Sequence, residues 1–185
     1  MISNIDMSTI FSTSHLISSL LVGMTLVESI SYGWHRFAEH IGIFGKMVSY
    51  RHYIHHEKNY PVKNLRPQGI TKYQTVHPWS WYIPTAITCG LVFFLLPLVY
   101  AVPIFIGGLI HGAFIVKLHE TFHIENHWLT RFNWYRRLVS LHDIHHFGPW
   151  NYGIAFFWLD RFFGTLKEKP PYEREINFPS IASSK

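Results

Sequence analysis

Residues 73–116 read YQTVHPWSWYIPTAITCGLVFFLLPLVYAVPIFIGGLIHGAFIV, and this run decides the fold class. It fills the interval between Lys72 and Lys117 without a single Asp, Glu, Lys or Arg. One continuous helix of that length would measure about 66 Å, whereas a bilayer hydrocarbon core is about 30 Å thick. The run therefore predicts two membrane spans, near 81–98 and 100–118, folded back on each other.

Prolines and aromatic residues mark the ends of this hairpin. Pro97 and Pro103 bracket the expected reversal, because proline ends a helix without leaving a buried amide unpaired. Trp81 and Tyr100 stand where interfacial anchors are expected. The alternative interpretation is a buried helical hairpin inside a soluble protein.

An earlier span is expected near 9–32, where leucine, valine and methionine dominate. Six serines and Glu28 interrupt it, so its pattern is weaker than that of the hairpin. A cleaved signal peptide is not expected, because no basic segment precedes the apolar one and the span runs directly into Tyr32-Gly33-Trp34-His35.

The distribution of basic residues predicts the orientation. All sixteen Lys and Arg lie in 36–72 or from Lys117 onward, and the net charge is +5. Three spans place both basic regions on one side, which the positive-inside rule makes cytoplasmic. Nucleic acid is not an expected partner, because no basic helix or RNA-binding aromatic motif is present.

Composition agrees with a membrane protein of one domain. Hydrophobic residues make up 48% and charged residues 15% of 185 residues, against about 25% charged in soluble domains. The single cysteine, Cys89, excludes a disulfide framework and any cysteine-based zinc or iron–sulfur site. Fourteen histidines are the outlier.

Ten of those histidines form four compact groups. The groups are His35-Arg-Phe-Ala-Glu-His40, His52-Tyr-Ile-His55-His56, His119-Glu-Thr-Phe-His123 and His142-Asp-Ile-His145-His146. On a helix, positions i, i+3 and i+4 share a face, so each His-x-x-His-His sequence is expected to point three imidazoles in one direction. His35 and His40 are about 140° apart on an ideal helix and converge only if the helix is distorted or ends there.

Neutral imidazole is a ligand for iron, zinc, copper or nickel. Ten imidazoles exceed the needs of one ion, so two ions with about five ligands each are expected. Five of these histidines follow the first span and five follow the third, all on the same predicted side.

Other polar residues are candidates for supporting roles. His111 lies inside a span, where an ionisable group is costly and tends to be functional, so it either lines a substrate path or packs against a neighbouring span. His127 continues the spacing of His119 and His123 and is a candidate eleventh ligand. Glu28 is either a partner of a ligand imidazole or an end-of-span residue, and Asp143 is a second candidate partner.

The four histidine groups, split by a membrane hairpin, resemble the fatty acid hydroxylase/sterol desaturase superfamily of membrane di-iron oxygenases. Asn151-Tyr152-Gly153 and the segment from Trp158 to Thr165 are similar to the sequence after that family's last histidine box. The resemblance covers roughly 30–166. It implies one domain over 1–185: an all-α bundle of three to four spans, a cytosolic helical cap (33–79 and 119–166) with a dimetal centre, and a polar tail (167–185).

The resemblance also implies cofactors and partners. Two iron ions would be held by the ten grouped histidines, and zinc would replace iron in some purified samples. The reaction would be lipid–H + O2 + two electrons + two protons giving lipid–OH and water, or the desaturated lipid. A separate donor, such as a cytochrome b5 or ferredoxin system, would supply the electrons, in a bacterial inner membrane or the endoplasmic reticulum.

Two alternatives to a fatty acyl hydroxylase remain open from the sequence. A sterol or carotenoid would be oxidised by the same chemistry. A non-redox membrane zinc-binding protein would use the same ligands without O2.

Overall fold

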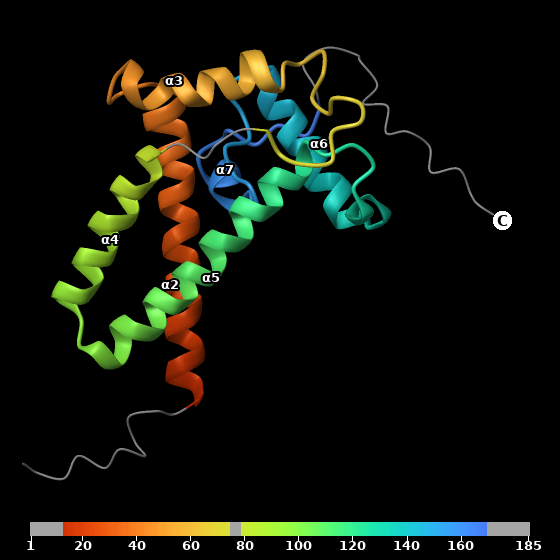
Figure 1. Cartoon of the computed structure of the whole chain (residues 1–185). Coiled ribbons are helices and arrows are strands. Elements are labelled where there is room, and N and C mark those ends of the chain that lie inside the picture. Colours follow the sequence, from red (N-terminus) through yellow and green to blue (C-terminus); the bar gives the residue numbers. More distant parts are fainter. Residues whose placement is uncertain (1–12, 75–78, 170–185) are drawn as a thin grey trace, which may run out of the picture.

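The computed structural model describes residues 13–74 and 79–169, and every regular element in that part of the chain is helical (Figure 1). The outer residues of the expected first span (9–12), His77, and the tail from 170 onward lie outside the described residues. The prediction of an all-α architecture is confirmed for the described part.

Two long helices cross each other beneath the cap (Figure 1). Helix α2, Thr13–Gly33, continues without a break into a π-helix, η1, Trp34–His40, and helix α5 runs over Leu98–Phe122. Both are long and apolar enough to cross a membrane. They agree with the expected first and third spans.

Glycines allow the close crossing of α2 and α5. A Cβ atom on Gly23 would lie 1.9 Å from the Ile104 carbonyl oxygen, and one on Gly107 would lie 2.2 Å from the Leu20 carbonyl oxygen. Only glycine fits at either position, so the two backbones touch directly. Such small-residue contacts are typical of helix pairs in membranes.

The expected second span is shorter than predicted. Helix α4, Tyr82–Leu95, has 14 residues and is about 21 Å long, less than a hydrocarbon core. It ends where Leu96 becomes extended before Pro97, and α5 starts at once, so Pro103 lies inside α5 and not in the reversal. The hairpin still returns the chain to the side from which it started (Figure 1).

The faces of these helices are apolar on the outside. No residue of α4 is buried, and Phe94 and Leu95 are 85% and 66% exposed. Ile110 of α5 is 60% exposed. A contiguous apolar surface of this kind fits a lipid environment.

A helical cap covers the C-terminal ends of α2 and α5 (Figure 1). Its elements are α3 (Lys46–Ile54), π-helix η2 (His55–Asn59), 3-10 helices η3 (Trp79–Trp81) and η4 (Trp128–Arg131), α6 (Asn133–Phe147) and α7 (Trp158–Phe162). Phe122 of α5 packs against Tyr135 and Val139 of α6 in the main apolar core. This core sets the ends of α5 and α6, which carry four of the grouped histidines, side by side.

Candidate metal centre

Nine of the ten grouped histidines form two neighbouring clusters in the cap. Within each cluster the nearest ring nitrogens, one from each residue, all lie within 4.8 Å of one another. The first cluster contains His35, His40, His52, His56 and His145. The second cluster contains His55, His123, His142 and His146. The tenth, His119, borders the second cluster, with its ring centre 4.7 Å from that of His142 and 5.0 Å from that of His55.

The division differs from the one expected from chain order. Each His-x-x-His-His sequence sends its first and last imidazoles to one cluster and its middle imidazole to the other. Adjacent helical residues point about 100° apart, whereas residues four apart share a face. His56 and His145 thus meet in the first cluster, and His55 and His146 in the second. The expectation of three imidazoles in one direction was wrong.

A π-helix brings His35 and His40 together. In η1 the backbone bonds run from residue i to i−5, as in the 3.0 Å bond from Ile41 N to Arg36 O. Residues five apart then lie one turn above each other. The two ring centres are 5.0 Å apart, so the distortion that the spacing required is present.

Backbone carbonyls orient two imidazoles of the first cluster. Nδ1 of His35 lies 2.7 Å from the Tyr152 carbonyl oxygen, and Nδ1 of His145 lies 2.7 Å from the Trp150 carbonyl oxygen. A carbonyl oxygen only accepts, so both Nδ1 atoms carry the proton. The lone pairs of these neutral rings are therefore on Nε2, which faces the cluster interior.

A buried carboxyl group faces a third imidazole of the first cluster. Glu39 is 4% exposed, and its Oε2 lies 3.5 Å from Nδ1 of His52. Its Oε1 accepts a 2.9 Å hydrogen bond from Nε1 of Trp81. Trp81, expected only as an interfacial anchor, thus holds the carboxyl group that faces His52.

The second cluster is held by the loop that follows η2. The Leu65 carbonyl oxygen accepts from Nδ1 of His123 at 3.0 Å, and the neighbouring Arg66 is ion-paired with Asp143. The ring of Tyr60 stacks on His123 with centres 4.0 Å apart. Within the described residues Asp143 makes no hydrogen bond to an imidazole; through Arg66 it anchors the loop whose Leu65 carbonyl contacts His123.

The interior of the first cluster is set for a cation. Nε2 of His35 faces Nε2 of His52 at 3.1 Å, and Nε2 of His40 faces Nε2 of His145 at 3.1 Å. Because Nδ1 of His35 and Nδ1 of His145 each donate to a carbonyl oxygen, Nε2 of each ring presents a lone pair to this interior. These lone pairs are available to a metal ion.

Both clusters contain a buried ring nitrogen without a hydrogen-bond partner, which also indicates metal binding. Buried Nε2 atoms of His56 and His55, in the first and second clusters respectively, have no hydrogen-bond partner. Buried polar atoms normally find a partner, and ligand nitrogens find it in a metal. The donor set of these residues fits two ions.

Burial keeps the imidazoles neutral. It lowers the pKa of His52, His142 and His145 well below the value near 6.5 of a solvated histidine, and the charged form of neighbouring imidazoles would lower it further. The pKa of His123 falls to about 3 for the same first reason. Neutral rings are the form that binds metal.

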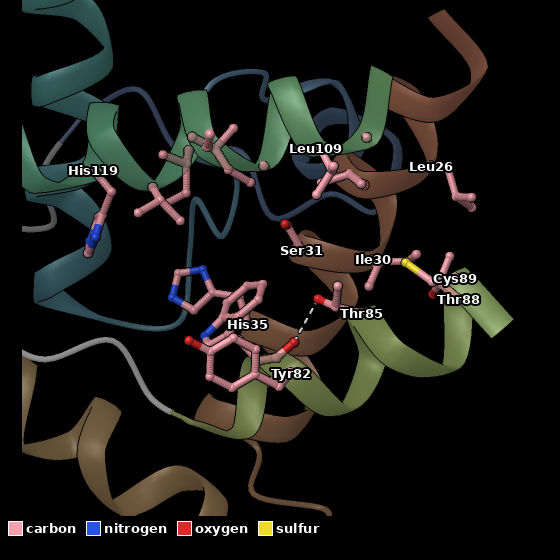
Figure 2. Close-up of a pocket in the computed structure, with 18 of the residues that line it drawn as sticks. Leu26, Ile30, Ser31, His35, Tyr82, Thr85, Thr88, Cys89, Leu109 and His119 are labelled. Carbon is pink, nitrogen blue, oxygen red and sulfur yellow. Dashed lines mark hydrogen bonds between the residues drawn. The ribbon is translucent and has the colours of Figure 1, made fainter. Parts of the chain in front are cut away.

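A cavity of about 490 Å³ lies between α2, α4 and α5 and ends at both clusters. His35, His52, His55 and His119 line one end, and Leu26, Val92 and Phe105 line the apolar remainder. Figure 2 shows His35 and His119 at one end and Leu26 and Cys89 at the other. The volume falls in the range of small-molecule sites, about 300–1,000 Å³.

His111 and Glu28 do not take part in that cavity. Nε2 of His111 lies 2.7 Å from Oε2 of Glu28, and both side chains are almost fully buried between α5 and α2. Oε1 of Glu28 accepts from the Phe156 backbone at 3.1 Å. Neither residue lines the cavity, and the hydrogen bonds of Glu28 go to His111 and Phe156 and not to a clustered imidazole. This placement agrees with the packing alternative for His111.

His127 is outside both clusters. Helix α5 ends at Phe122, so the four-residue spacing that suggested an eleventh ligand no longer applies. Nδ1 of His127 instead accepts from the Leu129 backbone at 3.4 Å, at the start of η4.

Sequence reasoning missed the groups that orient the ligands. The carbonyls of Leu65, Trp150 and Tyr152 leave no trace in a residue pattern, because every residue has one. Arg66 was not singled out either. Asn151-Tyr152-Gly153 was noted as a similarity, but no role was assigned to it.

A family model described as fatty acid hydroxylase matches residues 20–165. No curated protein and no solved structure matches the chain at a significant level. The matched range contains all ten grouped histidines, the cavity and the Asn151-Tyr152-Gly153 segment.

Proposed function

Because the chain belongs to the fatty acid hydroxylase family, we propose that it is a membrane-bound di-iron oxygenase that hydroxylates a fatty acyl chain. Family membership makes it an oxidoreductase of the lipid hydroxylase or desaturase type. The identity of the substrate and the identity of the metal go beyond family membership and are our proposal. The observation that carries them is one apolar cavity, lying between candidate spans, that ends at both histidine clusters.

The cofactor assignment follows from the donor set. His35, His40, His52, His56 and His145 would hold one iron ion, and the second cluster with His119 would hold the other. When bound, this pair supplies O2 activation, which an unactivated C–H bond requires and side chains alone do not provide. Imidazole accepts zinc as well, and zinc lies above iron in the affinity series, so purified samples exposed to zinc are expected to contain some.

The protein's own residues bind and orient the lipid. Leu26, Val92 and Phe105 offer an apolar surface to an acyl chain, which aligns it along α5 toward His35 and His119. The same packing excludes water from the buried ends of the clusters, where His142 and His145 are each 1% exposed. Orientation of a C–H bond against the metal centre is then the contribution of the fold.

The cavity also separates the alternatives. A non-redox zinc-binding protein has no use for an apolar cavity that ends at its ligands, and transport needs polar groups through the bilayer. A rigid sterol or a carotenoid remains the competing substrate class, and desaturation the competing outcome.

The side of the membrane and the electron donor are part of the proposal. Basic residues gather in the cap regions, which supports a cytoplasmic cap. We propose that a separate cytochrome b5- or ferredoxin-like protein supplies the electrons from that side. Cysteines placed at the exposed Lys58 and Lys169, in a Cys89→Ser background, test the side by impermeant thiol labelling in sealed vesicles. Opposite accessibility of the two positions contradicts the assignment.

Lipid profiling under ¹⁸O2 tests the function. Cells that express the protein should accumulate a hydroxylated fatty acyl lipid carrying one ¹⁸O atom, and cells that express His142→Ala should not. A product that has lost two hydrogens without gaining ¹⁸O identifies a desaturase. If ¹⁸O enters a sterol or a carotenoid, the substrate belongs to that class instead. If no lipid changes in cells that supply electrons, the protein is not an oxygenase.

A further inference from the structure

The segment 150–153 (Trp150, Asn151, Tyr152, Gly153) presents two carbonyls to one metal cluster. The carbonyls of Trp150 and Tyr152 receive Nδ1–H of His145 and His35, each at 2.7 Å. These imidazoles come from α6 and η1, and the two histidines are more than a hundred residues apart in the chain. One short segment thus fixes two ligands from opposite ends of the sequence.

A buried carboxylate fixes the segment itself. Oδ1 of Asp160 accepts from the Tyr152 amide at 2.8 Å and from the Thr165 hydroxyl at 2.7 Å. Oδ2 accepts from the Gly153 amide at 2.8 Å. Asp160 is 0% exposed, so these three donors are what satisfies it.

The neighbouring residues complete the hold. Asn151 is also 0% exposed; its amide nitrogen donates to the Leu141 carbonyl at 3.0 Å and its Oδ1 accepts from the Lys167 amide at 2.7 Å. A Cβ atom on Gly153 would lie 2.6 Å from the Phe156 carbonyl oxygen, so only glycine fits there. These contacts account for the Asn-Tyr-Gly sequence and for the Asp and Thr that follow it.

The second cluster is oriented by a different part of the chain. Its His123 is fixed by Leu65, and Leu65 is followed by Arg66, which pairs with Asp143. Within the described residues, the side-chain hydrogen bonds of Asp160 go to Tyr152, Gly153 and Thr165 and not to that loop.

We propose that Asp160 is a positioning residue for the first cluster alone, which aims the Tyr152 and Trp150 carbonyls at His35 and His145 so that Nε2 of each faces a metal ion. The proposal rests on the proposed dimetal centre. It predicts that Asp160 sets the affinity of one of two metal sites and leaves the other unchanged.

Asp160→Asn removes the cradle without changing its size. The asparagine side chain has only one accepting oxygen. Its NH2 group would face a backbone N–H, and two donors do not hydrogen-bond to each other. The segment then loses at least one anchor, and groups that orient ligands change metal affinity about 10- to 100-fold when removed. The second cluster in the same molecule serves as the internal control for folding.

Zn²⁺ titration against a competing chelator tests the proposal without any turnover assay. The wild type should show two sites, and Asp160→Asn should weaken one of them at least about 10-fold. His40→Ala disables the first cluster and His142→Ala the second. Asp160→Asn should therefore add no loss to His40→Ala but should remove most of the binding that His142→Ala retains.

Two outcomes overturn the proposal. One is Asp160→Asn with both affinities unchanged; the other is equal weakening of both sites, which would make the residue a general structural support. If Asp160→Asn does not fold, Thr165→Val removes only one donor and is judged by the same criteria. A wild type without two sites refutes the proposed dimetal centre instead, so the two failures are distinguishable.

Discussion

His55 and His56 are neighbours in the chain, yet their imidazoles lie in different clusters, His55 with His123 and His56 with His145. The same separation holds for His145 and His146. Each His-x-x-His-His sequence therefore contributes to both metal sites, so the two sites share their supporting helices.

Single substitutions of these neighbours should remove different ions. His55→Ala and His56→Ala should each leave about one metal ion per chain, and the double variant should leave almost none, because each loses a ligand of a separate site. His56→Ala combined with His40→Ala should still hold one ion, since both belong to the first cluster. Elemental analysis of purified protein checks this. The control is His15→Ala, a substitution at an exposed histidine, which should keep two ions per chain. If the double variant His40→Ala/His56→Ala lost both ions, the assignment of these two residues to one cluster would be wrong.

Acid should destabilise the metal-free protein. Burial lowers the native pKa of His123 to about 3, and those of His142 and His146 shift in the same direction, whereas unfolded histidines titrate near 6.5. Below about pH 6.5 the unfolded chain binds protons that the native state does not, so stability is complete above that pH and is lost as the pH falls toward the native values.

Denaturation of the metal-free protein in detergent at about pH 7.5 and about pH 5.5 measures this loss. A variant in which His142 and His146 are replaced by Gln should show a smaller difference between the two pH values. Equal stability of the unsubstituted protein at both values would mean that its clustered imidazoles are not held neutral.

A side chain at Gly112 should block the cavity. Gly112 lines it, and a Cβ atom there meets nothing closer than Val27 Cγ1 at 3.8 Å, so Gly112→Phe fits the helix and fills the space meant for the lipid. Turnover should fall at least about tenfold, a barrier increase of about 1.4 kcal/mol, while the metal content stays unchanged. Ile110→Phe on the exposed face of α5 is the matched control. Full turnover by Gly112→Phe would show that the lipid approaches elsewhere.

The Glu28–His111 pair should act on stability and not on product choice. Removing either partner leaves the other buried and unpaired, which costs on the order of 3 kcal/mol, and the double variant should lose less than the sum of the singles. Thermal unfolding in detergent measures the loss. His111→Ala with retained stability and a shifted hydroxylation position would instead assign the residue to the substrate path.

The sequence was most informative where spacing and charge carry the signal. The uncharged run of 73–116 predicted a hairpin, and the histidine spacing identified the residues that gather in the cap. The length of α4 was missed because the extended Leu96 before Pro97 ends that helix early. His127 was a candidate ligand from its spacing alone, and the end of α5 at Phe122 breaks that spacing.

The arrangement of the clusters depended on features that residue types do not encode. A π-helical turn over Trp34–His40 brings His35 and His40 to one face. Backbone carbonyls at Leu65, Trp150 and Tyr152 then choose the ring nitrogen that faces inward. These are tertiary contacts between distant segments, so local periodicity does not contain them.

Iron content after anaerobic purification measures the proposed dimetal centre itself. We expect two iron ions per chain in the wild type, falling to about one in His145→Ala, because that residue serves the first cluster only. A wild type that binds one ion or none under iron-replete conditions would contradict it, as would a His145→Ala variant that keeps both.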